Sequence, residues 1–539
     1  MAIKRLQLIV VLFAGLLFLT GLAFWLVPGF IEKKRAWNSP SQTDSLAASE
    51  GELVQDSWEA AYYLDGARAG NIHTQVFSVD TPEGLAFRHR VLMNLKVQRY
   101  GSTVPMKMEQ SSLESPEGKV RALGMVQYLD QGKQVLEGRV DGENLFVSQG
   151  KIERRVDFPP NVLGPYAQEL LLGAKSQEPN AAWSVTSFEL SLQAPTQLDG
   201  RVLGSEETEV PQGGHGKAKL AVILEKLDKV EIVPRPVKVG GQEIVLPSLE
   251  VWCRAGKPVK SRVDMPGLGP ITLVRTSREE AERPAQTGEV PPDLGAKTLV
   301  FLDRAIPRVH EQREVAYQFS LPGDRDPAKA FMLDARQVAS GDQSSDKNGS
   351  FTLVVKGEQE GYVRAPQPGK AALESNFYID SADPQVTVLA AKAIGDEKDA
   401  WRRALRIELF VHQGMSSTSA VGFARASQVA RDLKGDCRQH AMLAAAMCRA
   451  SGVPARTALG LVYITDQTSG KPALGFHMWT EVWAGGSWRG IDATLGQGRI
   501  GPGHVKISDT TWTDPPSLAP LLPVLRVMGR LQARVVDFR

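Results

Sequence analysis

Apolar and polar residues alternate along much of the first half of the chain. The clearest stretch runs from Leu85 to Val97, where apolar side chains alternate with charged or amide side chains. This period of two is typical of a β-strand that buries one face. Turn signals such as Asp65-Gly66 recur between similar stretches. The pattern therefore predicts an antiparallel, β-rich domain over residues 57–280.

The period becomes helical from about residue 380. Asp383 followed by Pro384 is typical of the start of a helix. Two further helices are predicted at about residues 400–412 and 426–433. Before them, a linker is expected at residues 281–295. A smaller β domain should follow at 296–372, with its first strand near Thr298–Leu302.

The first apolar stretch of the chain is of another kind. Residues 6–27 contain no charged residue, and about 20 apolar residues are enough to span a bilayer as a helix. A cleaved signal peptide is the alternative, but its apolar stretch is usually shorter. We therefore expect a single-pass transmembrane anchor at residues 6–27, a flexible stalk at 28–56 and a body outside the cytoplasm.

Composition and charge exclude several classes of function. The chain has 63 Lys and Arg against 61 Asp and Glu, a net charge of +2. No basic stripe interleaved with aromatic residues is visible, so we expect no nucleic-acid partner. No metal-ligand spacing, phosphate loop or nucleotide fingerprint is visible either, so we expect no metal and no cofactor. Three sparse cysteines do not form a disulfide framework.

Two of those cysteines, Cys437 and Cys448, lie in the segment GDCRQHAMLAAAMCRAS. The segment predicts a buried helix with Cys437 in its first turn and Asp436 or Gly435 as its cap. Unpaired N–H groups at a helix N-terminus favour negative charge, and the thiolate is the reactive form of cysteine. The N–H of Cys437 could also donate to an oxyanion. The alternative is a small buried side chain without chemistry, which we prefer for Cys448.

A second piece of candidate chemistry follows in a predicted hairpin. Two strands, 476–484 and 487–493, flank a pair of glycines. With a loop of even length, His477 faces position 494, and Asp492 lies diagonally from His477 on the same face, within reach of its side chain. A carboxylate there could fix the tautomer of the imidazole and hold the ring toward a nucleophile. The alternative is a polar cross-strand pair without a catalytic role.

The segments GDCRQHAML, GVPARTALGLVY and FHMWTEVWAGGSWRGIDATLG resemble the core of the transglutaminase-like superfamily. The likeness covers about residues 380–510, with its motifs in the family's order. It implies a papain-like fold with Cys437 as nucleophile, His477 as general base and Asp492 as the third member. The β-rich region upstream also resembles bacterial membrane-anchored members, which implies a periplasmic body.

Three accessory residues are candidates for lining the site. His440 lies one turn after Cys437, Trp479 shares the face of His477, and Gln413 is a candidate for a second oxyanion donor. Each also has a packing interpretation. Arg456 is expected to pair with a core carboxylate such as Glu481.

The expected fold class is α+β: an N-terminal transmembrane helix, antiparallel β-rich regions and a C-terminal transglutaminase-like, papain-like core. The expected function is that of a membrane-anchored cysteine enzyme, which would act on amide or ester carbonyls through a thioester acyl-enzyme. It would be a peptidase, an amidase or an acyltransferase. The alternative is a catalytically silent, membrane-anchored binding or scaffold protein of the cell envelope. Expected partners are a protein or peptide substrate and a lipid bilayer.

The expected units are the anchor (6–27), the stalk (28–56), the β-rich domain (57–280), the linker (281–295), the smaller β domain (296–372), the catalytic domain (380–510) and a C-terminal tail (511–539).

Overall fold

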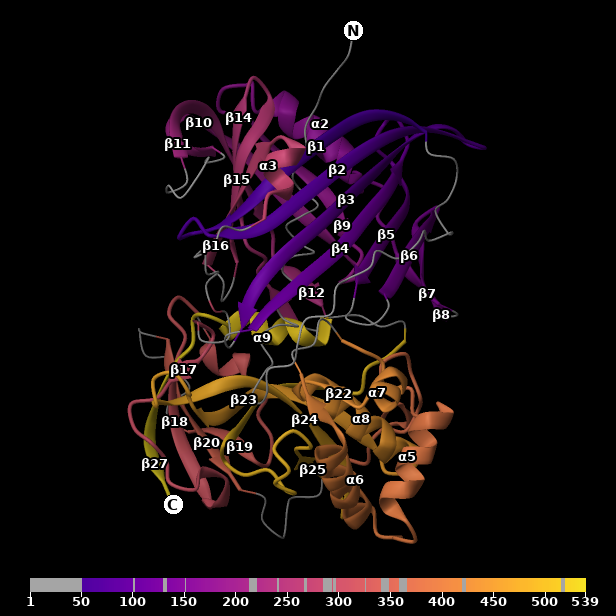
Figure 1. The fold of residues 1–539 in the computed structure, drawn as a ribbon, viewed down its shortest axis with the longest axis vertical. Coiled ribbons are helices and arrows are strands. Elements are labelled where there is room, and N and C mark those ends of the chain that lie inside the picture. Colours follow the sequence, from indigo (N-terminus) through magenta and orange to yellow (C-terminus); the bar gives the residue numbers. More distant parts are fainter. Residues whose placement is uncertain are drawn as a thin grey trace.

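The computed structural model shows two stacked bodies, one from each half of the chain (Figure 1). The first body is built almost entirely of strands, and the second combines strands with helices. The structure describes residues 51–539 except 100–101, 129–132, 151, 213–220, 240–241, 266–268, 285–292, 294–296, 325, 341–348, 358–365, 419–422 and 515–518.

In the described part of the chain, one antiparallel sheet of 14 strands makes up most of the first body. Its order is β8-β7-β6-β5-β4-β3-β2-β1-β16-β15-β14-β11-β10-β9. The strand predicted at residues 85–97 forms most of β3, and its alternating side chains Val91, Met93 and Val97 are buried. The strands are β1 (Glu52–Tyr63), β2 (Arg68–Thr81), β3 (Gly84–Arg99), β4 (Ser102–Glu114), β5 (Val120–Tyr128), β6 (Lys133–Asp141), β7 (Asn144–Gln149), β8 (Ile152–Asp157), β9 (Ala182–Glu189), β10 (Ala194–Gln212), β11 (Ala221–Pro234), β14 (Leu249–Arg254), β15 (Lys257–Met265) and β16 (Gly269–Thr276); β12 (Val237–Val239) and β13 (Gln242–Ile244) form a separate pair.

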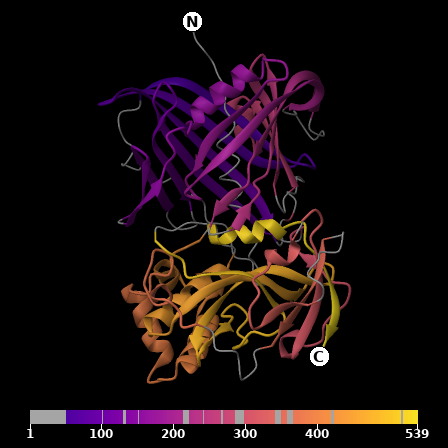
Figure 2. The same cartoon turned by 180° about the vertical axis from the view of Figure 1, so that it is seen from behind.

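This large sheet curls around its own apolar core. One cluster of buried side chains includes Met93 on β3 and Met106 on β4 together with Leu198 on β10 and Val230 on β11. These strands lie far apart in the order of the sheet, so its two halves must face each other. The view from behind shows the same curvature (Figure 2). Two helices accompany the sheet: α2 (Pro165–Lys175) and α3 (Arg278–Glu282).

In the described part of the chain, the second body contains two larger sheets, a short parallel pair formed by β21 and β22, and a group of helices. The central sheet runs β17-β24-β23-β26 with β25 beside β24, and a smaller sheet runs β19-β20-β18-β27. Helix α8 is buried from Cys437 to Arg449. The elements are β17 (Val300–Phe301), β18 (Glu314–Ser320), β19 (Gln337–Ser340), β20 (Ser350–Lys356), β21 (Ser416–Ser417), β22 (Lys434–Gly435), β23 (Ala455–Thr465), β24 (Pro472–Ala484), β25 (Ser487–Ile491), β26 (His504–Thr510), β27 (Gln532–Phe538), α5 (Pro384–Ile394), α6 (Ala400–Gly414), α7 (Ala426–Asp432), α8 (Cys437–Ala450), α9 (Leu522–Val527) and the short 3-10 helices η1 (Val309–Glu311), η2 (Pro327–Ala330), η3 (Lys370–Ala372) and η4 (Ala519–Leu521).

The helices that the sequence predicts in this second body are present. Asp383 caps α5 by accepting a hydrogen bond of 2.9 Å from a backbone N–H, and Pro384 occupies the first turn. The helices predicted at residues 400–412 and 426–433 correspond to α6 and α7. Local signals were sufficient here because caps and apolar spacing act within a few residues.

Some segments assigned to different units share one sheet. Strand β17 comes from the stretch expected to open the smaller β domain, and it pairs with β24 of the central sheet. Residues 511–539, assigned to a C-terminal tail, contain α9 and β27, and β27 pairs with β18. Strand pairing over such distances has no local sequence signal, which is why the pattern of the chain did not reveal it.

Helix α9 lies between the two bodies in both views (Figures 1 and 2). Its Leu522 and Leu525 belong to the apolar core of the first body. Its Val524 and Val527 belong to the core of the second body. A helix that buries apolar side chains on both sides joins the two cores, so the bodies are packed against each other and not only linked by chain.

The expected fold class needs correction. The described chain is predominantly β, and none of its helices is long and apolar enough to cross a membrane. The longer helix α6, for example, has 15 residues, whereas a bilayer requires about 20. The predicted anchor at residues 6–27 and most of the predicted stalk at 28–56 lie outside the described residues. The location of the body outside the cytoplasm stays a prediction.

Candidate active site

Cys437 lies in the first turn of a helix, as the sequence predicts, and is the first residue of α8. Asp436 caps the helix, and Gln439 completes a capping box by accepting from the backbone N–H of Asp436 at 3.1 Å. The Asp436 carboxylate also pairs with Arg438 at 2.6 Å, and both side chains are fully buried. Arg438 thus offsets the charge of Asp436 directly beside Cys437.

Glycine is required directly before this cap. The backbone of Gly435 has a φ of 152°, and a Cβ there would lie 2.4 Å from the Cβ of Gln439. The carbonyl of Gly435 accepts from the N–H of Thr418 at 3.1 Å, so the chain that leads into α8 is also held from outside the helix. The Gly-Asp-Cys sequence therefore fixes where the helix begins, and with it the position of Cys437.

The hairpin register predicted for His477 and Asp492 is confirmed where the strands pair. Thr480 lies opposite Ile491, and Ala484 lies opposite Ser487. Asp492 comes directly after the end of β25, and its Oδ2 lies 2.7 Å from Nε2 of His477. The predicted imidazole–carboxylate contact is thus present, with both side chains fully buried.

Helix α8 is fixed against the strand that carries His477. The hydroxyl of Thr480 on β24 donates to the carbonyl of Ala441 on α8 at 3.0 Å. Cys437 is fully buried, and it forms a hydrogen bond with His477 that helps raise the pKa of the ring. Nε2 is already bonded to Asp492, and Nδ1 makes no bond of standard geometry in the described part of the chain. Cys437 is nevertheless close enough to His477 to raise the pKa of its ring.

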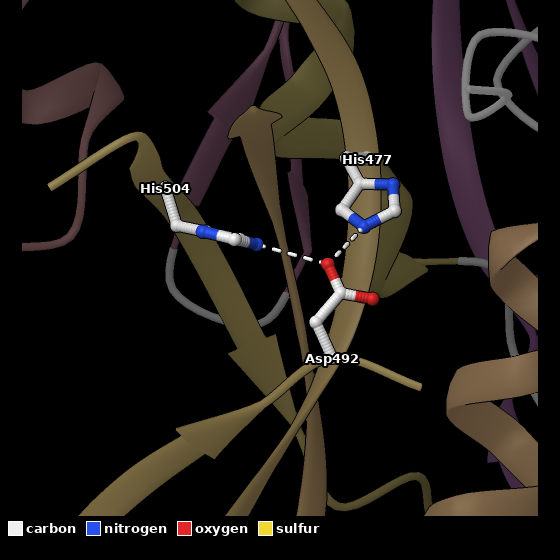
Figure 3. Close-up of side chains that lie close together, drawn as sticks. All are labelled: His477, Asp492 and His504. Atoms are coloured by element: carbon white, nitrogen blue, oxygen red, sulfur yellow. Dashed lines mark hydrogen bonds and ion pairs between the residues drawn. The ribbon is translucent and has the colours of Figure 1, made fainter. Parts of the chain in front are cut away.

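The carboxylate of Asp492 accepts four hydrogen bonds from described residues. Oδ2 accepts from Nε2 of His477 and, at 2.9 Å, from Nε2 of His504 (Figure 3). Oδ1 accepts from the backbone N–H groups of Thr494 and Leu495 at 2.9 and 3.3 Å. Burial by itself would raise the pKa of this carboxyl, but the charge of His477 and the hydrogen bonds from His477 and His504 hold it well below its usual range. Asp492 is therefore an anion at neutral pH.

His477 has the opposite shift. Burial lowers the pKa of a histidine, but here the charges of Asp492 and Cys437, and hydrogen bonds with both, raise it to about 10. The ring is therefore an imidazolium at neutral pH. Because this pKa lies above that of the unfolded chain, the stabilisation from the protonated ring is complete below pH about 6.5 and is lost as the pH rises through about 10.

A pH titration followed by NMR of ¹³C-histidine-labelled protein measures this shift. We expect the His477 ring to stay protonated until the pH approaches about 10. In Cys437→Ala the pKa of His477 should be lower, because the negative charge of the sulfur no longer raises it. A His477 ring that titrates near its ordinary pKa in both proteins would contradict the charge interactions with Asp492 and Cys437.

His504, at the start of β26, is a member of this cluster that the sequence did not reveal. A signal existed: the turn Gly501-Pro502-Gly503 precedes a short strand, which places a histidine at the start of a returning strand. Burial lowers the pKa of His504 to about 3, so its ring is neutral. Because a carboxylate oxygen only accepts, Nε2 of His504 must carry the proton.

The same three side chains could in principle hold a metal ion. One ligand atom each from His477, Asp492 and His504 lies within 4.8 Å of the others. The two N···O separations of 2.7 and 2.9 Å are those of hydrogen bonds. These bonds account for the cluster without an ion.

The accessory candidates differ in position. His440 is buried, and its Nδ1–H donates to the carbonyl of Asp436 at 2.8 Å; burial lowers its pKa. Trp479 is buried in a small cluster with Ala458 and Ile500, and its ring lies edge-on to His504 with centroids 5.2 Å apart. Gln413 is exposed on α6, and no side-chain hydrogen bond joins it to a residue of the cluster in the described part of the chain. The structure thus places His440 and Trp479 beside the cluster, whereas nothing links Gln413 to it.

Charged side chains stiffen the sheet beside the site. The predicted pair of Arg456 and Glu481 is confirmed, with an Nε···Oε2 distance of 2.8 Å. Lys506, two residues after His504, lies 3.0 Å from Glu481 and 3.3 Å from Asp509. Burial alone would raise the pKa of Glu481, but the two cations lower it to about 2. This cluster holds β23, β24 and β26 together next to the histidines.

Residues 388–493 match the family model described as the transglutaminase-like superfamily. The matched range contains the start of α8 and the whole of β24 and β25, and so includes Cys437, His477 and Asp492. The family resemblance seen in the sequence is confirmed over this part of the chain. A search among curated proteins found no match.

Several solved structures are similar to parts of the chain. A protein from Cytophaga hutchinsonii, described as a candidate cysteine protease, is 18% identical with a TM-score of 0.27, over 42% of this chain and 86% of that one. A β-barrel-like protein from Brucella abortus is 12% identical with a TM-score of 0.30, over 41% and 95% of the two chains. The periplasmic domain of TgpA from Pseudomonas aeruginosa is 16% identical with a TM-score of 0.26, over 39% and 85%. These distant likenesses assign no activity to this chain.

Proposed function

We propose, on the premise of a transglutaminase-like domain at residues 388–493, that this protein is a cysteine enzyme acting on amide or ester carbonyls through a thioester. The observation that carries the proposal is the buried series Cys437, His477 and Asp492. In it the carboxylate bonds to one side of the imidazole, and the charge of the sulfur raises the pKa of the ring. Such a series supplies a nucleophile, a proton carrier and a group that orients the carrier.

Acylation would start from the thiolate of Cys437 and the imidazolium of His477. The sulfur attacks the carbonyl carbon, and the resulting oxyanion accepts a hydrogen bond from the backbone N–H of Cys437. The tetrahedral intermediate collapses, and the bond between the carbonyl carbon and the leaving group breaks. His477 gives its proton to the departing amine or alcohol. Cys437 is left as a thioester, and His477 is neutral.

A second nucleophile would then release the acyl group. His477 takes the proton from the incoming molecule, which attacks the thioester carbonyl, and the sulfur leaves as the thiolate. Water gives a free acid, so the enzyme would be a peptidase or an amidase. An amine gives a new amide, so it would be an acyltransferase. We expect the acyl donor to be a protein or a peptide. Both outcomes use the same intermediate and the same residues.

One observation favours a second function, a catalytically silent binding or scaffold protein. The side chain of Cys437 has an exposed fraction of 0%. A substrate carbonyl can reach the sulfur only if a neighbouring segment moves. A protein that never makes this movement would keep the arrangement of the site without turnover, and its large curled sheet would then be the functional part.

Thiol labelling separates the two functions. Native protein is treated with iodoacetamide near neutral pH, and the labelled peptides are quantified by mass spectrometry. We expect Cys437 to react faster than the same residue in the unfolded chain. His477→Ala should slow it by about 10²-fold or more, because the charge partner is lost. Cys448 is the matched control: it lies in the same helix, and burial raises its pKa to about 12, so it should not react.

A covalent intermediate tests the mechanism itself. Incubation with p-nitrophenyl acetate should add an acetyl group to Cys437, detected as an increase in mass, and Cys437→Ala should abolish it. Cys448→Ala should retain it. Labelling of Cys437 no faster than in the unfolded chain, together with no acetyl adduct, would favour the scaffold function.

A further inference from the structure

Asp492 bonds to two imidazoles, whereas the acid of a nucleophile–base–acid triad needs to bond only to the imidazole of the base. His477 and His504 bond to the same oxygen, Oδ2, from two different strands (Figure 3). His504 is fully buried, and its Nδ1 has no hydrogen-bond partner in the described part of the chain. The bond to Asp492 is thus the polar contact that its ring makes there. An unpartnered buried nitrogen costs free energy, so stability alone does not explain this histidine.

The neutral state of His504 suits the geometry. Burial, together with the nearby rings of His310 and His477, keeps His504 uncharged although Asp492 acts in the opposite direction. A neutral N–H donor restrains the carboxylate without cancelling its charge. A cation in the same place would weaken the attraction that raises the pKa of His477. The carboxylate therefore keeps its full charge for the imidazolium while a second strand holds its orientation.

The ring of His504 is itself held in place. The ring of Trp479 lies edge-on to it, with the two ring centroids 5.2 Å apart. The ring of His310, on η1, has its centroid 5.1 Å from that of His504. The backbone carbonyl of His504 accepts from Arg336 at 2.6 Å. Two residues further along β26, Lys506 lies in the buried charge cluster. Because these contacts hold the His504 ring in place, its Nε2–H can restrain the Asp492 carboxylate to which it donates.

We propose that His504 is a positioning residue: its neutral Nε2–H fixes the Asp492 carboxylate in the orientation that turns the His477 ring toward Cys437. This inference rests on the proposed function, because the orientation matters only if Cys437 reacts. It assigns to β26 a role in the site, although that strand lies outside the matched range 388–493. Among the described residues, the titratable groups that interact with the Asp492–His504 pair include His310 on η1, Glu408 on α6, His440 on α8 and His477 on β24.

Two amide variants of His504 test the proposal in the full chain. The amide nitrogen of glutamine reaches about as far as Nε2 of histidine, whereas that of asparagine reaches only as far as Nδ1. We expect His504→Asn to slow alkylation of Cys437 about 10- to 100-fold, the value of a hydrogen bond to a charged group. His504→Gln, which keeps a donor to Oδ2, should stay within about tenfold of the wild type. Equal rates for the two variants would overturn the proposal.

A matched control removes a buried histidine elsewhere. His89 on β3 is also buried, and its Nε2 lies 3.3 Å from a carboxylate oxygen of Glu169. His89→Asn should leave the alkylation rate of Cys437 unchanged even if it lowers the melting temperature. A rate that merely follows melting temperature across His89→Asn, His504→Asn and His504→Gln would show a structural role and overturn the proposal.

A second measurement does not require a reactive thiol. The pKa of the Asp492 carboxyl is followed by ¹³C NMR in aspartate-labelled protein. It should rise in His504→Asn, which loses a donor to the anion, and stay near the wild-type value in His504→Gln. If Cys437 proves unreactive but this difference is found, the proposed function fails while the positioning contact stands. No rise in His504→Asn, or an inhibition of wild-type labelling by EDTA, would overturn the contact itself.

Discussion

Asp492→Asn is expected to lower turnover of an ester or amide probe by about 10³- to 10⁴-fold, the range seen when the acid of a nucleophile–histidine–acid series loses its charge. The carboxamide keeps the size of the side chain but not its charge. The pKa of His477 should therefore fall from about 10, because the charge of Asp492 is a main cause that raises it. As the pKa of His477 falls, a smaller fraction of the molecules has an imidazolium beside Cys437.

Turnover of p-nitrophenyl acetate as a function of pH measures this effect, and the basic limb of the profile should move to lower pH in Asp492→Asn. Asp199→Asn is the control, since Asp199 lies on the exposed side of the first body in a pair with Arg235. A turnover within about tenfold of the wild type would contradict the role of Asp492, because it would leave the lost charge without effect.

Lys506→Met is expected to lower the free energy of unfolding by about 3–5 kcal/mol, the cost of breaking a buried charge cluster by removing one partner. Lys506 lies 3.0 Å from Glu481 and 2.6 Å from Asp334, with an exposed fraction of 1%. Without it, the partly buried Arg456 is the cation that still pairs with the carboxylates of Glu481 and Asp509 among the described residues. Chemical denaturation of the two proteins at pH 7 measures the difference.

The pH dependence gives a further check on this cluster. The pKa of Glu481 lies at about 2 in the folded protein, below its value in the unfolded chain. Its stabilisation is therefore present above pH about 4.5 and is lost as the pH falls through about 2. In Lys506→Met the loss should begin at higher pH. The matched control is Lys392→Met on the exposed side of α5, which should change stability by about 0.5 kcal/mol or less.

The central part of the candidate site could be predicted because its signals are local. Gly435, Asp436 and Cys437 set a helix start by backbone conformation and capping, and both act over a few residues. Two glycines between short strands set the hairpin register, and that register brings Asp492 next to His477. Each step depends on neighbours in the chain, so the pattern of the sequence contains it.

The prediction was incomplete where long-range pairing decides. His504 reaches Asp492 because β26 pairs with β23, which in turn pairs with β24. Nothing near residue 504 in the sequence specifies that pairing. The role of α9 between two cores and the pairing of β27 with β18 have the same origin. The expected fold class was wrong because the described residues are mostly strand, and none of the helices they form is long and apolar enough to span a membrane.

By itself, the sequence determined the helix start at Cys437, the hairpin of His477 and Asp492, and the Arg456–Glu481 pair, because capping, turn geometry and cross-strand alternation are short-range effects. Only the tertiary structure decided that Asp492 accepts hydrogen bonds from two histidines and that Lys506 belongs to the buried charge cluster. It alone also decided that the C-terminal segment packs against both bodies. These contacts depend on which strands become neighbours. That choice is made by the burial of whole apolar faces, a property of the folded chain and not of any one segment.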